Sequence, residues 1–308
     1  MEIKSINKYK TQLPDKSAFQ IETDPDFIKM PTLSVFSGRR GGGKSVAVAN
    51  LLRTAKQKHY CDLVLLITPT YNSNKPIWDI CGIDESDVFE PTKNVLKDIV
   101  KRVEAEKQEF ETFLARQKQF AKYKKDIQHK PIHMIPPNQL MEYLDYGFLD
   151  NTFDEKWKYP VLQPPRISVV IDDAMGTDLM ACRTAGLTNL AIRHRHIADG
   201  LGISLFMLVQ SYCAQGGVAR PIRENTTHLF LFKINDEKQI AKVREESDLP
   251  VTEEEWRDMC GKAHSIPYNF LLCDFSAKCP HKRFRSGMND YLIPTSIKQK
   301  EKCMCKGK

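Results

Sequence analysis

With 308 residues, of which 41% are hydrophobic, the chain can form one large α/β domain with insertions or two small domains. It has no apolar run long enough to span a bilayer, and its start, MEIKSINKYKTQ, does not resemble a signal peptide, so we expect an intracellular protein. The nine cysteines are then expected to be reduced, and five that lie singly are expected to fill the core: Cys61, Cys81, Cys182, Cys213 and Cys260.

The net charge of +7 is concentrated at the C-terminal end. Residues 276–308 contain nine Lys or Arg residues, with Asp290 and Glu301 as their acidic residues, so the rest of the chain is neutral as a whole. We expect a basic tail over 276–308, which is either a solvated end or a contact with a phosphate backbone. Residues 1–30 are polar and are expected to form an N-terminal arm.

The first predicted strand, Leu33–Phe36, is followed by the stretch SGRRGGGKS and then by a predicted helix, Val46–Lys56. Three consecutive glycines would weaken either element, so something at this point must need bare backbone. An ordinary glycine-rich turn is the alternative, and the apolar strand before the stretch and the helix after it make that the weaker interpretation. The spacing matches G-x-x-x-x-G-K-[ST], a loop whose backbone N–H groups wrap a phosphate at the start of a helix. Lys44 would reach the β- and γ-phosphates, and the Ser45 hydroxyl would bind Mg²⁺. The predicted nucleotide-binding residues are Gly38, Arg39, Arg40, Gly41, Gly42, Gly43, Lys44 and Ser45.

Five apolar stretches are predicted to be strands that are buried on both faces of a mainly parallel sheet. Helical segments such as Val46–Lys56 and Ala185–His196 fall between several of them, and this alternation predicts an α/β fold with helices on both sides of the sheet. The predicted strands are Leu33–Phe36, Leu63–Thr68, Ile167–Ile171, Ile203–Val209 and His228–Phe232.

A long segment, 76–165, separates the second of these strands from the third. Its first part, about 93–126, has helical periodicity, and 93–130 carries eleven basic and six acidic residues. This helix is expected either to pack one face against its own core, to contact another subunit, or to face DNA. The second part is rich in proline and aromatic residues and is expected to be irregular.

Two acidic residues, Asp172 and Asp173, follow the strand Ile167–Ile171 directly. In P-loop enzymes the first acid at such a strand end helps to hold Mg²⁺, and a second acid can orient and deprotonate the attacking water. We therefore expect Asp172 to be the metal ligand and Asp173 to be the catalytic base. A strand that ends in an ordinary polar turn is the alternative interpretation.

The strand Ile203–Val209 ends in Gln210. One predicted strand lies between the loop strand and the acid-bearing strand, and a further strand follows, which is the order of RecA-like P-loop NTPases of the additional-strand type. In these proteins a polar residue at this strand end senses the γ-phosphate. We expect Gln210 to be this sensor, with an ordinary strand cap as the alternative.

The sequence resembles the genome-packaging ATPases of large DNA viruses and their relatives, which include poxvirus-type, giant-virus, virophage and Polinton-like enzymes of the FtsK–HerA superfamily. The resemblance covers about Thr32–Lys233 without 76–165, and it is carried by SGRRGGGKS, LLITPTYNSN, VVIDDA, RHRHIADGLGISLFMLVQSY and PIRENTTHLFLFK. It implies a homo-oligomeric ring that pumps double-stranded DNA into a capsid with ATP and Mg²⁺. It also implies a location in the host cytoplasm, a viral factory or the virion, and a capsid or portal partner.

The resemblance places Lys44 and Ser45 in the phosphate loop, Asp172 at the metal position and Gln210 at the sensor position. Asp173 occupies a position where cellular members of the superfamily usually have Glu, although viral members commonly have the Asp-Asp pair.

Ring ATPases also need a cation from the neighbouring subunit to neutralise charge in the transition state. Arg195 lies near the position at which cellular members carry a candidate arginine, but the spacing to the following strand is longer here by several residues. Arg193 and Arg223 are therefore competitors, and each of the three arginines could instead be a surface salt-bridge partner.

A zinc site is not expected at the C-terminal end. The spacings C-x5-C-x-H and C-x-C differ from the usual paired ligand spacing of structural zinc sites. The residues concerned are Cys273, Cys279, His281, Cys303 and Cys305.

We thus predict an ATPase domain over 31–275, interrupted by the insertion 76–165, with an arm at 1–30 and a tail at 276–308. The predicted activity is ATP-driven movement of double-stranded DNA without sequence preference. One alternative is another DNA-dependent ATPase of the superfamily, such as a helicase or repair enzyme. A second is a nucleotide-gated assembly scaffold that barely hydrolyses ATP.

Overall fold

The computed structural model describes residues 21–129, 131–148, 155–174, 176–177, 179, 186–213, 217–247, 249 and 251–300. Within them the chain forms one nine-stranded sheet in the order β3-β2-β4-β5-β1-β6-β7-β8-β9. The strands are β1 (Leu33–Ser37), β2 (Leu63–Ile67), β3 (Val88–Phe89), β4 (Ile167–Ile171), β5 (Ile203–Val209), β6 (His228–Phe232), β7 (Phe270–Asp274), β8 (Phe284–Ser286) and β9 (Asp290–Tyr291).

The first six strands of the sheet order are parallel to one another, and the five strands predicted from the sequence are all among them. Strand β1 is central, with Val35 opposite Met207 of β5 on one side and opposite Leu229 of β6 on the other. All five predicted strands are mainly apolar and are buried along their whole length, because both faces of a parallel sheet are covered by helices.

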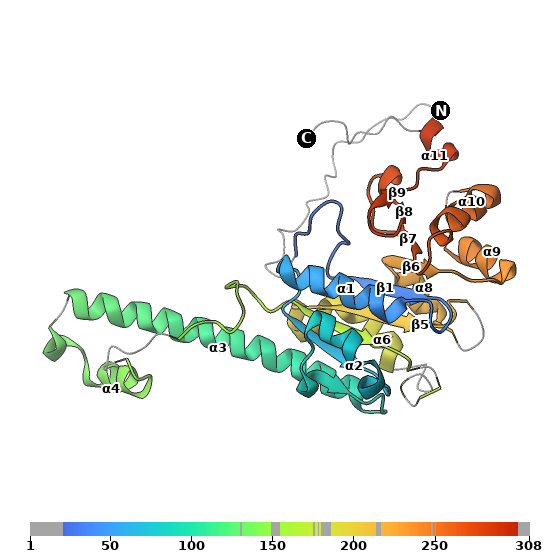
Figure 1. Cartoon of the computed structure of the whole chain (residues 1–308). Helices are drawn as coiled ribbons and strands as arrows, with labels where there is room; N and C mark the ends of the chain where they lie inside the picture. Colours follow the sequence, from blue (N-terminus) through green and yellow to red (C-terminus); the bar gives the residue numbers. More distant parts are fainter. Residues whose placement is uncertain are drawn as a thin grey trace, which may run out of the picture.

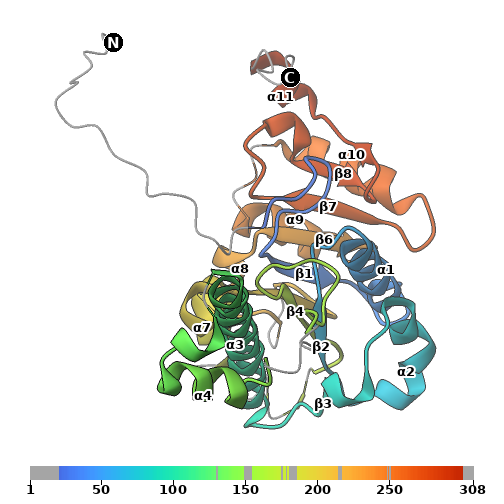
Figure 2. The same ribbon diagram turned by 90° about the vertical axis from the view of Figure 1, so that its left-hand side faces the viewer.

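Alternate residues of each strand pack on opposite faces of the sheet. On one face Phe36, Phe206 and Phe230 pack with Leu52 of α1. On the other face the core continues into α3, α6, α8, α9 and α10. Figure 2 shows α1 and α2 on one side of the strands and α3, α7 and α8 on the other, which confirms the predicted three-layer α/β fold. The helices of these layers are α1 (Lys44–Gln57), α2 (Tyr71–Trp78), α6 (Gly186–Arg193), α7 (Ile197–Gly200), α8 (Arg220–Asn225), α9 (Glu237–Glu246) and α10 (Glu253–His264).

The predicted insertion contains a single 35-residue helix, α3 (Val95–His129), which is about 50 Å long at 1.5 Å per residue. Its first turns pack on the sheet through Val95, Ile99 and Val103. The helix then extends away from the sheet and carries α4 (Pro137–Asp145) near its far end (Figure 1). A separate small core joins the two helices there, formed by Tyr123, Ile135, Tyr143 and Phe148.

The structure corrects the boundaries expected for the two ends of the chain. Part of the segment 276–308 belongs to the sheet, because β8 pairs with β7 and β9 pairs with β8, both antiparallel. Residues 21–30 also pack on the domain, with Ile28 and Met30 buried. The two segments contact each other: Asp26 Oδ1 accepts hydrogen bonds from Lys282 Nζ at 2.9 Å and from the Tyr291 hydroxyl at 2.7 Å.

The basic charge of 276–308 is thus partly neutralised within the fold. Arg285 is 1% exposed and donates to the backbone oxygen of Asp26. A short helix, α11 (Thr295–Lys300), follows β9, while residues 1–20 and 301–308 lie outside the described part. Of the cysteines expected to fill the core, Cys61, Cys81, Cys213 and Cys260 are buried, whereas Cys182 lies outside the described residues.

Candidate functional site

The loop 38–45 joins β1 to α1 and needs glycine for two different reasons. Gly41 and Gly43 have φ values of 73° and 93°, a region in which side chains are strained. Gly38 has an ordinary φ, but a Cβ placed on it would lie 2.5 Å from Cβ of Phe232 on the neighbouring strand β6. The glycines therefore let the loop turn tightly while it lies directly against the sheet.

The start of α1 offers free backbone donors beside this loop. The N–H groups in the first turn of an α-helix have no intrahelical partner, and no side chain caps α1. The Lys44 ammonium donates to the backbone oxygens of Gly38 at 2.8 Å and Arg39 at 2.9 Å, so it is folded over the loop. Burial lowers the pKa of Lys44, although Asp172 and Asp173 act in the opposite direction. These groups together form a positive, concave surface suited to an anion.

The acid pair lies at the carboxyl end of β4, next to this loop. The Ser45 hydroxyl donates to Asp172 Oδ2 at 3.1 Å across 127 residues of sequence. Asp172 is 5% exposed, and burial raises its pKa, with the Ser45 hydrogen bond acting against the increase. A hydroxyl and a carboxylate that meet at a phosphate loop are the kind of oxygen ligands that Mg²⁺ takes together with substrate phosphates and water.

Asp173 and Gln210 line the same space as residues 40–45 of the loop. Asp173 adopts φ of 50°, and Gln210 is exposed at the end of β5. Both belong to the lining of a cavity of about 820 Å³ that also includes 40–45 and Asp172. The tertiary structure therefore brings together the loop, Asp172, Asp173 and Gln210, which the sequence motifs single out. They meet because the carboxyl ends of adjacent parallel strands share one edge of the sheet.

The cavity is also lined by residues that were not identified from the sequence, and four of them come from two distant parts of the chain. Thr70 and Asn74 come from the region just after β2, and the Asn74 amide donates to the Thr70 hydroxyl at 3.1 Å. The polar stretch that follows the strand in LLITPTYNSN is the sequence feature from which these two residues could have been predicted. Tyr268 lies in the turn before β7 and Phe270 is the first residue of β7, more than two hundred residues after the loop, and no spacing in the sequence connects them with it.

The three candidate arginines differ in their surroundings, and none of them lines this cavity. Arg223 is mostly buried, forms an ion pair with Glu246 and donates to the backbone oxygen of Val218 at 2.5 Å. Arg193 and Arg195 are exposed, at the end of α6 and in the turn that follows it.

Arg195 lies at the opposite edge of the sheet from the cavity. A Cβ placed on Gly202, at the start of β5, would lie 3.2 Å from Cα of Arg195. Gln210 follows the other end of this seven-residue strand, about 26 Å from Gly202 along the strand direction. An arginine side chain does not span that distance, so Arg195 does not reach the cavity of its own chain.

The expected absence of a zinc site concerns residues that the structure describes only in part. Cys279 Sγ lies 4.0 Å from His281 Nδ1, and Cys273 is fully buried in β7. Among the described residues there is no group of three or more His, Cys, Asp or Glu side chains arranged to hold a metal ion. Cys303 and Cys305 lie outside the described residues.

No helix in the described part of the chain combines the length and apolar character needed to cross a membrane. No protein-family model matches the chain, and no curated protein sequence is significantly similar to it.

Several solved structures are similar to the chain at low identity. The genome-packaging NTPase B204 of Sulfolobus turreted icosahedral virus 2, solved with ATP-gammaS, has a TM-score of 0.42 and 12% identity, covering 82% of this chain and 94% of that chain. EssC (ATPases 2 and 3) from Geobacillus thermodenitrificans has a TM-score of 0.43 and 14% identity, covering 80% of this chain and 38% of that chain. The pCW3 conjugation coupling protein TcpA has a TM-score of 0.40 and 16% identity, covering 80% and 58%. The chain thus spans less than two thirds of the EssC and TcpA chains.

Proposed function

We propose that this chain is a Mg²⁺-dependent ATPase that moves double-stranded DNA, and that it packages a viral genome into a capsid. The observation that carries the proposal is the single cavity in which the loop 38–45, the Ser45–Asp172 pair, Asp173 and Gln210 meet. This is the set of groups that phosphoryl transfer to water requires: a phosphate cradle, a metal site, a base and a γ-phosphate sensor.

The roles of these residues follow from where they lie. Lys44 would leave the loop carbonyls and bind the β- and γ-phosphates. Ser45 and Asp172 would hold Mg²⁺, and Asp173 would orient the attacking water. Gln210 would report the state of the γ-phosphate to β5, whose other end lies near Arg195.

We propose that the active form is a homo-oligomeric ring in which an arginine completes the site of the neighbouring subunit. Arg193 and Arg195 fit this role better than Arg223, because they are exposed and lie away from their own cavity. The Arg223 guanidinium is already held by Glu246 within its own chain.

Contacts with DNA would be made to its phosphates by exposed basic side chains, which gives binding with little sequence preference. The distal part of α3 offers such a surface, because Lys118, Lys122 and Lys125 are exposed and follow one face of the helix. A capsid or portal component would be the second partner, in the host cytoplasm, a viral factory or the virion.

The test is steady-state ATP hydrolysis by the purified full chain, with and without long double-stranded DNA, at low and moderate salt. We expect DNA to stimulate hydrolysis, the stimulation to weaken as salt rises, and Lys44→Ala to reduce hydrolysis on the order of 100-fold or more. A Lys118→Ala, Lys122→Ala, Lys125→Ala variant should lose DNA stimulation and keep basal hydrolysis if the distal face of α3 binds DNA.

Asp173→Asn separates a motor from an assembly scaffold. The motor predicts that hydrolysis falls roughly 10²- to 10⁴-fold while ATP binding is kept, because only the base is lost. Unchanged activity in this variant, or hydrolysis that ignores DNA even when capsid components are added, would contradict the proposal. Strand separation without movement along duplex DNA would instead favour a helicase of the same superfamily.

A further inference from the structure

Tyr268 has an unusual environment for a tyrosine. Its side chain is 75% exposed, the largest exposed fraction among the large apolar and aromatic side chains of the described residues. Its backbone has φ of 60°, in the left-handed region that bulky residues rarely adopt. A strained conformation that presents an aromatic ring to solvent is more often found at functional sites than elsewhere.

The turn that carries Tyr268 is fixed by its neighbour Asn269. The Asn269 amide donates to the backbone oxygen of Ala263 in α10 at 3.0 Å and to the Ser286 hydroxyl in β8 at 2.9 Å. Its backbone N–H donates to the oxygen of Ile266 at 3.3 Å. Because a helix and a strand both hold Asn269, the position of Tyr268 is set before any ligand arrives.

This turn brings Tyr268 against the phosphate loop. A Cβ placed on Gly43 would lie 3.3 Å from Cβ of Tyr268 and 3.6 Å from its ring carbon Cδ1. Tyr268 and Gly43 line the same cavity, together with the apolar side chains of Val46, Ala47 and Phe270. The cavity therefore has a charged part around Lys44 and Asp172, and an apolar part beside Tyr268.

Phe270 gives this apolar part a rigid base. It is 8% exposed and packs against Phe230 and Phe232, with ring centroids 5.2 and 5.3 Å apart. Phe270 is therefore committed to the core of the sheet. The Tyr268 ring has no aromatic partner of this kind among the described residues, and the residue is largely exposed.

We propose that the Tyr268 ring binds the base of the nucleoside triphosphate whose phosphates lie in the loop 38–45. This inference rests on the proposed function, because it assumes that a nucleotide occupies the loop. Stacking of a base on an aromatic side chain depends little on which base it is, since every base has a π-face. Tyr268 therefore contributes affinity for nucleotides over inorganic phosphates and little discrimination among bases.

The experiment compares a ligand that has a base with one that lacks it. Binding of Mg²⁺-ATP and of Mg²⁺-tripolyphosphate to the full chain is measured by calorimetry for the wild type, Tyr268→Ala and Tyr268→Phe. We expect Tyr268→Ala to weaken ATP binding roughly 10-fold and to leave tripolyphosphate binding unchanged. Tyr268→Phe should bind both ligands as the wild type does, because stacking does not need the hydroxyl.

Ile266→Ala is the matched control, because Ile266 is an exposed apolar residue of the same turn and does not line the cavity. It should bind both ligands normally. In Tyr268→Trp, the indole fluorescence should change when ATP binds and not when tripolyphosphate binds.

Three results would overturn the proposal. Unchanged ATP affinity in Tyr268→Ala would show that the ring does not contact the base. Equal weakening of ATP and tripolyphosphate would show that Tyr268 supports the phosphate loop instead. A wild-type protein that binds neither ligand would refute the proposed function itself, which distinguishes that failure from a failure of the stacking role alone.

Discussion

At the scale of single residues, the candidate site keeps an ionisable carboxyl group in a buried position. Asp172 is 5% exposed, and it has one hydroxyl donor, Ser45, at 3.1 Å. Burial makes its carboxylate form costly, which is why its pKa is raised. A Mg²⁺ ion bound with a nucleotide would supply the missing positive charge.

This arrangement predicts that Asp172→Asn stabilises the ligand-free protein. The raised pKa means that the folded protein binds the Asp172 proton more tightly than the unfolded chain does, so stability falls as the pH rises above the ordinary value of 3.8. At pH 7 we expect the variant to gain about 1 kcal/mol, or roughly 2–4 °C in Tm, in a thermal melt without nucleotide. The stabilisation that Mg²⁺-ATP gives to the wild type should be absent.

Asp173→Asn is the control for this measurement, because Asp173 is only partly buried. Its Tm without ligand should equal that of the wild type. A lower Tm for Asp172→Asn than for the wild type at pH 7 would show that the carboxylate is stabilised within the fold, contrary to the prediction.

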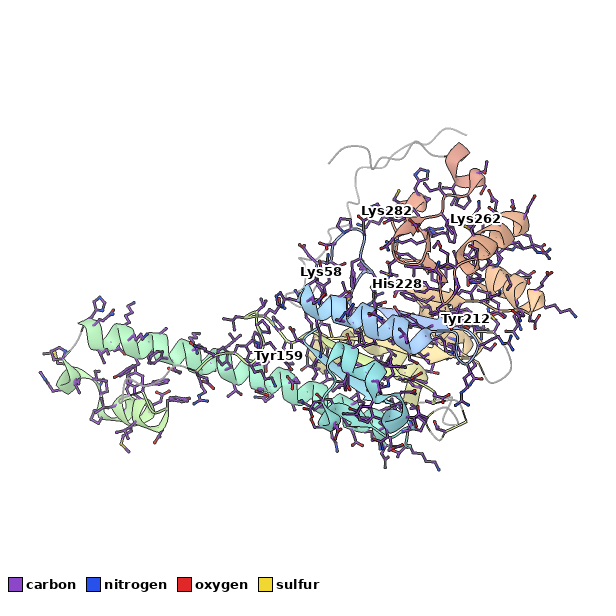
Figure 3. The ribbon with its side chains drawn as sticks, viewed as in Figure 1. Lys58, Tyr159, Tyr212, His228, Lys262 and Lys282 are labelled. Carbon is purple, nitrogen blue, oxygen red and sulfur yellow. The ribbon has the colours of Figure 1, made fainter. Side chains whose placement is uncertain are left out.

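At the scale of elements, the long helix α3 depends on one buried acid for its attachment. Glu106 has a fully buried side chain. Two of its partners come from the segment that leads from α4 back to β4: Lys158 Nζ at 2.8 Å and the Tyr159 hydroxyl at 2.9 Å. Arg102, one turn earlier in α3, forms a further ion pair with it. Figure 3 shows Tyr159 beside α3, near the point at which the helix extends beyond the sheet.

We therefore predict that Glu106→Ala weakens the contact between α3 and the segment that contains Lys158 and Tyr159. Burial opposes ionisation, but the hydrogen bonds from Lys158 and Tyr159 and the charge of Arg102 lower the pKa of Glu106 below 4.5 overall. A depressed pKa means that this stabilisation is fully present above pH 4.5 and is lost as the pH falls through the folded value. We expect Glu106→Ala to cost roughly 2–3 kcal/mol at pH 7, less than a fully buried pair because Arg102 and Lys158 are partly exposed.

The measurement is chemical denaturation at pH 7 and at pH 3.5, together with limited proteolysis of the projecting segment formed by the distal part of α3 and α4. Glu104→Ala, at an exposed position of the same helix, should behave like the wild type. If Glu106→Ala lost as much stability at pH 3.5 as at pH 7, the loss would come from packing and not from the charge.

At the scale of the whole molecule, the proposed ring requires a neighbouring chain to complete the site. Two cationic side chains line the cavity, Lys44 and Arg40, and none of the three candidate arginines is among its lining residues. Arg195 lies at the far edge of its own sheet, beside Gly202. In a ring with head-to-tail contacts, a surface of one subunit meets a different surface of the next, so one subunit's far edge can face its neighbour's cavity.

Mixed rings test this arrangement. We expect the Arg193→Ala, Arg195→Ala double variant to lose DNA-stimulated hydrolysis roughly 10³-fold or more, as removal of an arginine finger does. Lys44→Ala should also be inactive alone. Mixing the two should restore part of the activity, because the double variant then supplies an intact loop and its neighbour supplies the arginines.

Arg223→Ala is the comparison, since its partners lie in its own chain. It should lose stability. Mixing it with Lys44→Ala should not restore activity, in contrast to the double variant. Failure of the double variant to recover in any mixture would place the essential arginine elsewhere or refute a shared site.

Much of the fold was predictable from the sequence. The five central strands were recognised because a parallel sheet covered on both faces requires continuous apolar runs, such as LSVF and ISVVI. The loop 38–45 and the Asp172–Asp173 pair were singled out in the sequence because the chemistry predicted for them needs fixed residue types at short spacings. The strand β8 was not recognised, because it has three residues and lies within a basic segment that resembles a solvated tail. The strand β7 was also missed, although its sequence FLLCD is mainly apolar.

The sequence by itself determined the loop 38–45, the acids that follow β4 and the α/β character, because each of these depends on residues close together in the chain. Tertiary structure alone decided that Tyr268 lies against Gly43, that Arg195 lies far from its own cavity, and that Asp26 neutralises part of the basic segment. The physical reason is that strand order in the sheet, with β1 between β5 and β6 and β7 beyond it, sets which distant residues meet. Strand order depends on the packing of the whole core, which no local pattern specifies.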